Sequence, residues 1–324
     1  MRIHVPAMLA AALLAGGAAS LCIELVQMLE PHRFPSPIDV VANSLGALAG
    51  AALCGLAARR LGASALVGRL SLELPLMGLI YLLVPLLWVG SLAIGENMLR
   101  LTMLALPVAF GAVLLGAMQR HHFGPGGAAT PRGMALITAA AVALGTFPVL
   151  VVAPGAVAAL CGLGAAVVLR HATLPAAGVE RRFELPALRT AIPFLVIYLA
   201  AGALLPLLEP PIPLIADVEI RTVEILRLLH AAAAFTLLGY VIAELRGRLE
   251  QPLRTTFPRV LIASLPPAAA TAAAAQFAPA GSSGMHAATL WLLLCTGGAC
   301  YGAWLYHLQR EHVRALVAGR RHAA

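Results

Sequence analysis

Two carboxylates, two amides and an arginine are arranged with helical spacing in a largely apolar stretch near the N-terminus of the chain. Glu24 and Gln27 are three residues apart, so they share one face of a helix. Asp39 and Asn43 are four residues apart and share a face of a second helix. Arg33 lies between them, in a connection rich in proline. These residue types would support acid–base chemistry by Glu24 and Asp39 on a substrate held by Gln27, Arg33 and Asn43.

A structural network is the alternative interpretation of the same residues. Every polar group in hydrocarbon needs an internal partner, so the arginine and the amides can simply satisfy the carboxylates. In the catalytic interpretation, Arg33 pairs with Asp39 near the turn, and the deeper Glu24 is the candidate proton donor. Both interpretations predict that Asp39 and Asn43 face the first helix.

Two glycines continue the stripe of Asp39 and Asn43 along the second helix. Gly46 and Gly50 form a small-xxx-small motif, which lets two helices approach closely, and we expect them to pack the hairpin. Gly298 and Gly302 repeat this spacing near the C-terminus. The repetition predicts a degenerate copy of the hairpin that kept its packing glycines and lost its acids.

The order of these residues resembles the VanZ-like family of bacterial membrane proteins, over roughly residues 5 to 58. The family takes its name from a glycopeptide resistance factor, and the resemblance implies a role in the cell envelope. The target would be a lipid or a lipid-linked precursor, because an outward polar cleft with an arginine suits an anionic headgroup. The positions that carry the resemblance are Glu24, Gln27, Arg33, Asp39, Asn43 and Gly46.

A histidine further along the chain extends the resemblance. The family often carries a histidine element at the outer end of a helix that precedes its Glu-x-x-Gln helix, and Arg227-x-x-His230 is similar to it. This implies His230 as a further catalytic residue, a proton acceptor, and Arg227 as a further substrate-binding residue. The alternative is an arginine that extends to the interface and a partly solvated histidine. Either the true start lies upstream of Met1, or the helix of His230 supplies the missing element.

The composition indicates a polytopic membrane protein. Only 11% of the 324 residues are charged, compared with roughly 25% in soluble domains. The net charge of +8 is carried by arginines that flank apolar stretches, as membrane topology requires, so it does not indicate nucleic-acid binding. About 20 apolar residues cross a bilayer. We expect an all-α transmembrane bundle of about ten helices, near residues 5–29, 38–58, 72–94, 98–118, 134–152, 155–169, 190–208, 222–244, 258–276 and 286–307.

The arginines also predict the topology. With the N-terminus in the cytoplasm, all the arginines lie inside except Arg33, Arg100, Arg221 and Arg227. We therefore expect a multi-pass protein of the bacterial inner membrane with both termini cytoplasmic. Residues 134–169 stay open, because two spans and one interrupted hairpin preserve the same bias. The regions expected are a hairpin at 1–60, middle helices at 61–189, and a C-terminal half at 190–324.

Cofactors and metals are not indicated by any motif. The five cysteines lie in apolar stretches without metal-ligand spacing. The N-terminal apolar run continues past the length of a signal peptide, which favours an uncleaved first helix. The expected partners are membrane lipids, among them an anionic lipid headgroup. A small-molecule transporter and a non-catalytic membrane scaffold remain the alternative functions, and the oligomeric state stays open.

Overall fold

The structure is a computed structural model of the whole chain. It describes residues 5–27, 36–60, 63–93, 98–123, 130–174, 184–208, 217–247, 253–276 and 285–321. Within these ranges the chain is helical and contains no strand, which confirms the predicted all-α fold. The α-helices are α1 Val5–Gln27, α2 Pro37–Arg60, α3 Ala63–Leu92, α4 Met98–Met103, α5 Ala105–Met118, α6 Pro131–Gly145, α7 Pro154–Thr173, α8 Glu184–Leu208, α9 Asp217–Gly247, α10 Leu253–Gln276 and α11 Met285–Arg321.

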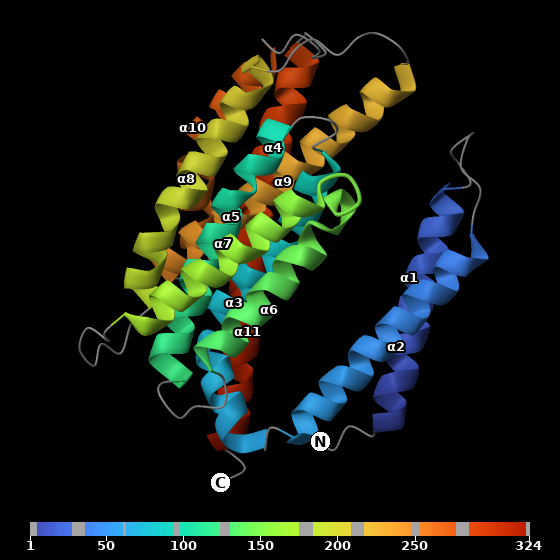
Figure 1. Cartoon of the computed structure of the whole chain (residues 1–324), viewed down its shortest axis with the longest axis vertical. Helices are drawn as coiled ribbons and strands as arrows, with labels where there is room; N and C mark the ends of the chain where they lie inside the picture. Colours follow the sequence, from blue (N-terminus) through green and yellow to red (C-terminus); the bar gives the residue numbers. More distant parts are fainter. Residues whose placement is uncertain are drawn as a thin grey trace. The chain divides into compact units, whose positions relative to one another are not determined.

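The contacts divide the chain into two compact units, Met1–Leu72 and Glu73–Ala324. In the first unit, α1 and α2 pack on each other as an antiparallel hairpin (Figure 1). Two glycines of α1 allow the close approach: a Cβ added at Gly16 would lie 2.6 Å from the Cβ of Ala47, and one at Gly17 would lie 3.0 Å from Oγ of Ser44. The predicted helical hairpin is therefore present.

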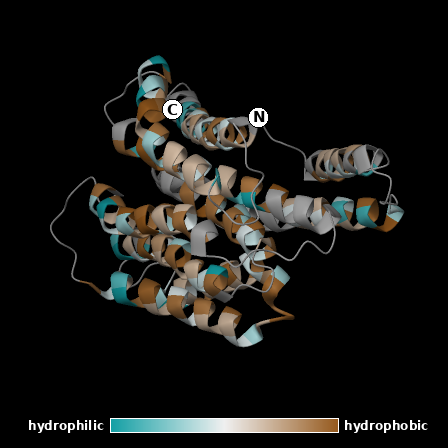
Figure 2. Ribbon diagram, turned by 90° about the horizontal axis from the view of Figure 1, so that it is seen from above, coloured by the Kyte–Doolittle hydropathy of each residue, from teal (hydrophilic) through white to brown (hydrophobic). Residues whose placement is uncertain are grey.

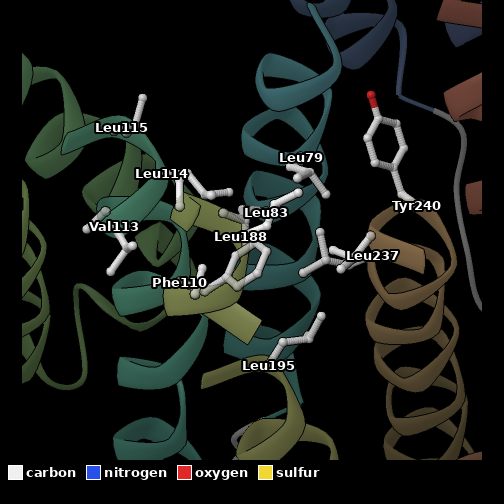
Figure 3. Close-up of a cluster of buried hydrophobic side chains, with 14 of the residues drawn as sticks. Leu79, Leu83, Phe110, Val113, Leu114, Leu115, Leu188, Leu195, Leu237 and Tyr240 are labelled. Atoms are coloured by element: carbon white, nitrogen blue, oxygen red, sulfur yellow. The ribbon is translucent and has the colours of Figure 1, made fainter. Parts of the chain in front are cut away.

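The second unit is a helical bundle around one main hydrophobic core. Figure 3 shows side chains of this core from α3, α5, α8 and α9, among them Leu83, Phe110, Leu188 and Leu237. Because α5 and α9 lie on opposite sides of residue 189 and both contribute to this core, helices from both predicted later regions are joined there. The predicted region boundaries themselves stay predictions.

Glycines bring α9 and α11 into close contact at the centre of this unit. A Cβ added at Gly298 would lie 2.6 Å from the carbonyl oxygen of Ala232, and one at Gly302 would lie 2.8 Å from the backbone nitrogen of Tyr240. On α9, a Cβ at Gly239 would meet the carbonyl of Ala299. The atoms that would be met are backbone atoms, so only glycine allows this approach.

Residues 134–169 lie mainly in two helices, α6 and α7, which is compatible both with two spans and with one interrupted hairpin. α6 ends at Gly145, seven residues before the predicted end. Phe147 precedes Pro148, which disfavours the helical conformation for Phe147, and a short 3₁₀ helix at Phe147–Val149 follows. α7 then begins with Pro154 at its first position, where proline is well tolerated. At 1.5 Å per residue α6 is only about 22 Å long, shorter than a hydrocarbon core of about 30 Å.

Five helical stretches are long and apolar enough to cross a membrane, among the residues described. They are Leu99–His121, Pro154–Thr173, Leu185–Leu205, Ile225–Leu245 and Ala287–Glu311. Shorter apolar helices are Leu9–Cys22, Pro37–Ala52, Gly78–Leu92 and Pro131–Gly145. The expected ten spans and the cytoplasmic termini stay predictions.

The outer faces of the helices are apolar as well. Apolar residues, shown in brown in Figure 2, lie along most of the helices. Large apolar side chains such as Leu136, Val196 and Ile262 are more than half exposed. Water would make this exposure costly, whereas lipid is as apolar as these side chains. The protein is therefore a membrane protein.

Candidate functional site

The carboxylate of Glu24 stabilises the start of α2 in the hairpin. Glu24 is only 6% exposed, and one of its oxygens accepts a 2.7 Å hydrogen bond from the backbone N–H of Ser36. Ser36 precedes Pro37, the first residue of α2, and its backbone carbonyl accepts a 3.0 Å bond from the N–H of Asp39. A negative side chain is favourable here, because a helix N-terminus carries partial positive charge.

A second contact joins the same two helices one turn deeper. The amide nitrogen of Asn43 donates a 2.9 Å hydrogen bond to the hydroxyl of Ser20, and Ser20 is 3% exposed. Ser20 lies four residues before Glu24, so both face α2 from one side of α1. Asn43 therefore faces the first helix, as the sequence predicts, and the two contacts fix the register of the hairpin.

The other polar residues of the hairpin have different outcomes. Asp39 was expected to face the first helix, but it is exposed in the first turn of α2. Arg33 and the side chain of Gln27 lie outside the described residues. The proposed pairing of Arg33 with Asp39 and the substrate-binding role of Gln27 therefore stay predictions.

The prediction that Gly46 and Gly50 pack the hairpin is wrong. A Cβ added at either glycine would meet nothing within 4 Å, and both residues are exposed. The close approach comes from Gly16 and Gly17 of α1 instead, which face Ala47 and Ser44 of α2. The face of α2 that packs on α1 therefore carries the small side chains of Ser44 and Ala47. Gly46 and Gly50 lie on a different face, which is turned away from α1.

A pocket of about 100 Å³ lies within the second unit. It is lined by residues of α3, α4, α8, α9, α10 and α11. Its polar lining consists of Arg100, Tyr198, Arg227, His230 and Thr271. The sequence selected Arg227 and His230 as site residues, and the structure places both in this pocket.

His230 is hydrogen bonded through Nε2 to the hydroxyl of Tyr198 on α8. The two rings meet edge to face, with centroids 5.7 Å apart. Gly90 of α3 makes room for the imidazole, since a Cβ there would lie 3.0 Å from Nε2. The ring therefore has a fixed position between three helices. The proposed catalytic role of His230 stays a prediction.

Arg100 is a pocket residue that the sequence analysis did not select. One of its terminal nitrogens donates a 3.1 Å hydrogen bond to the carbonyl of Ala93, beyond the end of α3. A cation is favourable at this position, because the C-terminus of a helix carries partial negative charge. Arg100 therefore fixes the junction of α3 and α4 and also places a guanidinium in the pocket wall.

A known family accounts for the hairpin. Residues 2–58 match the model of the VanZ/LLP1 family. This VanZ/LLP1 segment covers α1 and nearly all of α2, and it confirms the resemblance on almost the same residues. The pocket lies beyond it, in the second unit. Comparison with curated proteins and with solved structures found no match.

Side chains that could bind a metal ion were sought in the part of the chain that the structure describes. No group of three or more His, Cys, Asp or Glu side chains lies together there. The polar groups of the VanZ/LLP1 segment are suited to hydrogen bonding and proton transfer, and those of the pocket are suited to binding an anion.

Proposed function

We propose that the protein is a VanZ-like cell-envelope protein of the inner membrane that acts at the outer leaflet on a lipid or a lipid-linked precursor. The observation that carries the proposal is the burial of a carboxylate, Glu24, inside the VanZ/LLP1 segment. Ionisable residues within membrane helices are costly, and they commonly mark functional sites.

The hairpin supports a division of roles between its two carboxylates. Glu24 lies in the last turn of α1 and is hydrogen bonded to Ser36, just before the start of α2. Glu24 and Asp39 therefore lie toward the same end of the hairpin. Asp39 is exposed there and can meet a headgroup, whereas Glu24 is shielded and accepts a single described hydrogen bond. In this proposal Glu24 exchanges a proton with the substrate, Asp39 assists, and Gln27, Arg33 and Asn43 hold the anionic headgroup.

The substitution Glu24→Gln tests the proposal. Glutamine keeps an oxygen that can accept the Ser36 N–H, so the hairpin should persist, but the side chain can no longer exchange a proton. In a deletion strain we expect the variant to reach the wild-type protein level and to restore neither glycopeptide resistance nor the pool of lipid-linked precursors. The matched control is Glu311→Gln, which changes an exposed glutamate of α11.

A variant with wild-type function would contradict the catalytic role. The hairpin would then be a scaffold whose polar residues only fix helix register. The hydrogen bond from Ser36 to Glu24 already shows how such a network is built. Loss of both function and protein level would also count against catalysis, because it would place the role of Glu24 in folding.

A transporter is the second candidate, and one observation favours it. Transport across the bilayer requires polar groups beyond one interface, and Glu244 of α9 is only 2% exposed, nearly four turns from His230. Tyr240, one turn before it, is hydrogen bonded to Gln309 of α11. Uptake of fluorescent phospholipid across proteoliposome bilayers tests this candidate. Transport predicts translocation that Glu244→Gln abolishes, and equal rates with and without protein would exclude phospholipid transport.

A further inference from the structure

We propose that the pocket of the second unit binds the phosphate group of an anionic amphiphile. Its elements come from α3, α4 and α8 to α11, so the site is separate from the VanZ/LLP1 segment. The proposal goes beyond the hairpin function and does not rest on it. Arg100 and Arg227 bind the phosphate, and the apolar wall holds the adjoining part of the molecule.

Charge is the first argument for an anionic ligand. Two arginines line the pocket, and none of its described lining residues is Asp or Glu. Ionisable residues inside a membrane bundle are rare and commonly mark ligand-binding sites. A guanidinium carries five N–H donors in a planar fork, so Arg100 can hold the Ala93 carbonyl and a ligand oxygen together. Arginine forks match the oxygens of a phosphate in pairs.

The position along the helices is the second argument. Gly90, Tyr198 and Thr271 lie in the C-terminal halves of α3, α8 and α10, whereas Arg100, Arg227 and Trp291 lie in the N-terminal halves of α4, α9 and α11. The pocket is therefore toward one end of the bundle. His230 is five residues inside its apolar span, or about 8 Å at 1.5 Å per residue. The upper part of lipid acyl chains occupies this depth, and the headgroups lie nearer the interface.

The chemistry of the wall is the third argument. The remaining lining is mostly apolar, with Met103, Leu104, Phe235 and Trp291 among its larger side chains. The linked Tyr198 and His230 supply hydrogen-bonding groups beside the arginines. A polar end with two cations and an apolar remainder fits an amphiphile better than a free inorganic anion, which would leave the apolar wall uncovered.

Trp291 offers a direct way to observe binding. The chain has three tryptophans, and of these only Trp291 is among the described pocket residues. Trp88→Phe and Trp304→Phe would leave it as the single fluorophore. This protein, purified in detergent, is titrated with short-chain phosphatidylglycerol, short-chain phosphatidylcholine and inorganic phosphate while the emission of Trp291 is recorded.

We expect phosphatidylglycerol to shift the emission saturably and to bind at least tenfold more tightly than phosphatidylcholine. In the same background, Arg227→Gln should weaken this binding about tenfold or more, as loss of a charge-assisted contact implies. Arg100→Gln should act similarly. The matched control Arg254→Gln, at an exposed arginine of α10, should bind as the parent protein does.

Other outcomes would overturn the proposal. Equal affinity for the two lipids, or equal binding by Arg227→Gln and Arg254→Gln, would exclude an anionic phosphate site. Inorganic phosphate that binds as tightly as phosphatidylglycerol would overturn the amphiphile and leave a free anion. Since Arg100 also holds the end of α3, loss of binding in Arg100→Gln alone, with Arg227→Gln unaffected, would show an indirect structural effect and contradict the proposal.

Discussion

Two pairs of glycines with the same spacing behave differently in this protein. Gly298 and Gly302 of α11 lie against the backbone of α9, where an added Cβ would meet carbonyl and amide atoms. Gly46 and Gly50 of α2 face open space. The spacing shows that one face of the helix carries no side chains at these positions. Whether another helix packs closely on that face depends on the residues of the other helix.

The difference comes from which helix contributes the small surface. In the hairpin, Gly16 and Gly17 of α1 meet Ala47 and Ser44 of α2, so side chain meets glycine. Between α9 and α11 glycines come from both helices, and backbone meets backbone. The second arrangement leaves no atom that can rotate away from an added methyl group. The four predictions below follow from this contrast.

Gly302→Ala should have the largest effect. Its Cβ would lie 2.8 Å from the nitrogen of Tyr240 and would also meet the carbonyl of Thr236, so α9 and α11 must separate. We expect a loss of about 1–3 kcal/mol or more in the free energy of unfolding, measured by thermal or denaturant unfolding of the purified protein in detergent. Unchanged stability would show that the helices are not packed so closely.

Gly16→Ala should have a smaller effect. The nearest atom to its Cβ is the methyl carbon of Ala47, at 2.6 Å, and the two helices of a hairpin can shift slightly. We expect a loss of about 1 kcal/mol, seen as faster hydrogen exchange of the α1 and α2 amides. The double variant Gly16→Ala with Ala47→Gly should recover most of this loss, and failure to recover it would place the clash elsewhere.

The Ser20–Asn43 contact should contribute less still. Hydrogen bonds between membrane helices average about 0.6 kcal/mol in double-mutant cycles. We expect a coupling free energy of this size between Ser20→Ala and Asn43→Ala, from the same exchange measurement. Strict additivity of the two substitutions would mean that the 2.9 Å bond adds nothing to the hairpin.

Gly46→Ala and Gly50→Ala should have the smallest effect on the hairpin. Neither Cβ would meet another atom within 4 Å, and alanine is the better helix former. We expect stability to stay the same or to rise by less than about 1 kcal/mol, again by hydrogen exchange. A marked loss of stability would show that these glycines pack against a surface that the described contacts do not include.

The sequence predicted the helices better than it predicted their neighbours. Runs of about 20 apolar residues located the helices, since the thickness of a bilayer sets the length of apolar sequence needed to cross it. The early end of α6 was missed, although Pro148 disfavours a helical conformation for the preceding Phe147. The open surroundings of Gly46 and Gly50 could not be predicted, because a stripe of glycines on one helix does not indicate which helix, if any, packs against it.

The candidate sites show the same limit. The orientation of Asn43 toward α1 was predicted correctly, because a polar residue in an apolar run needs a partner, and Asn43 has one in Ser20. The exposure of Asp39 was missed, since its position in the first turn of α2 lies beyond the packed part of the hairpin. Arg100 was missed as a pocket residue because no local pattern links it to Arg227, on a helix far along the chain.

Topology tests the central claim most directly, because the proposed function requires the hairpin turn to face the outer leaflet. Single cysteines are introduced by Phe34→Cys, Ile212→Cys, Ser64→Cys and Gln251→Cys in a cysteine-free protein, and intact cells are treated with a membrane-impermeant maleimide. The arginine distribution predicts labelling at positions 34 and 212 and protection at 64 and 251. Labelling at 64 and 251 with protection at 34 and 212 would place both sites on the cytoplasmic side and contradict the proposed function.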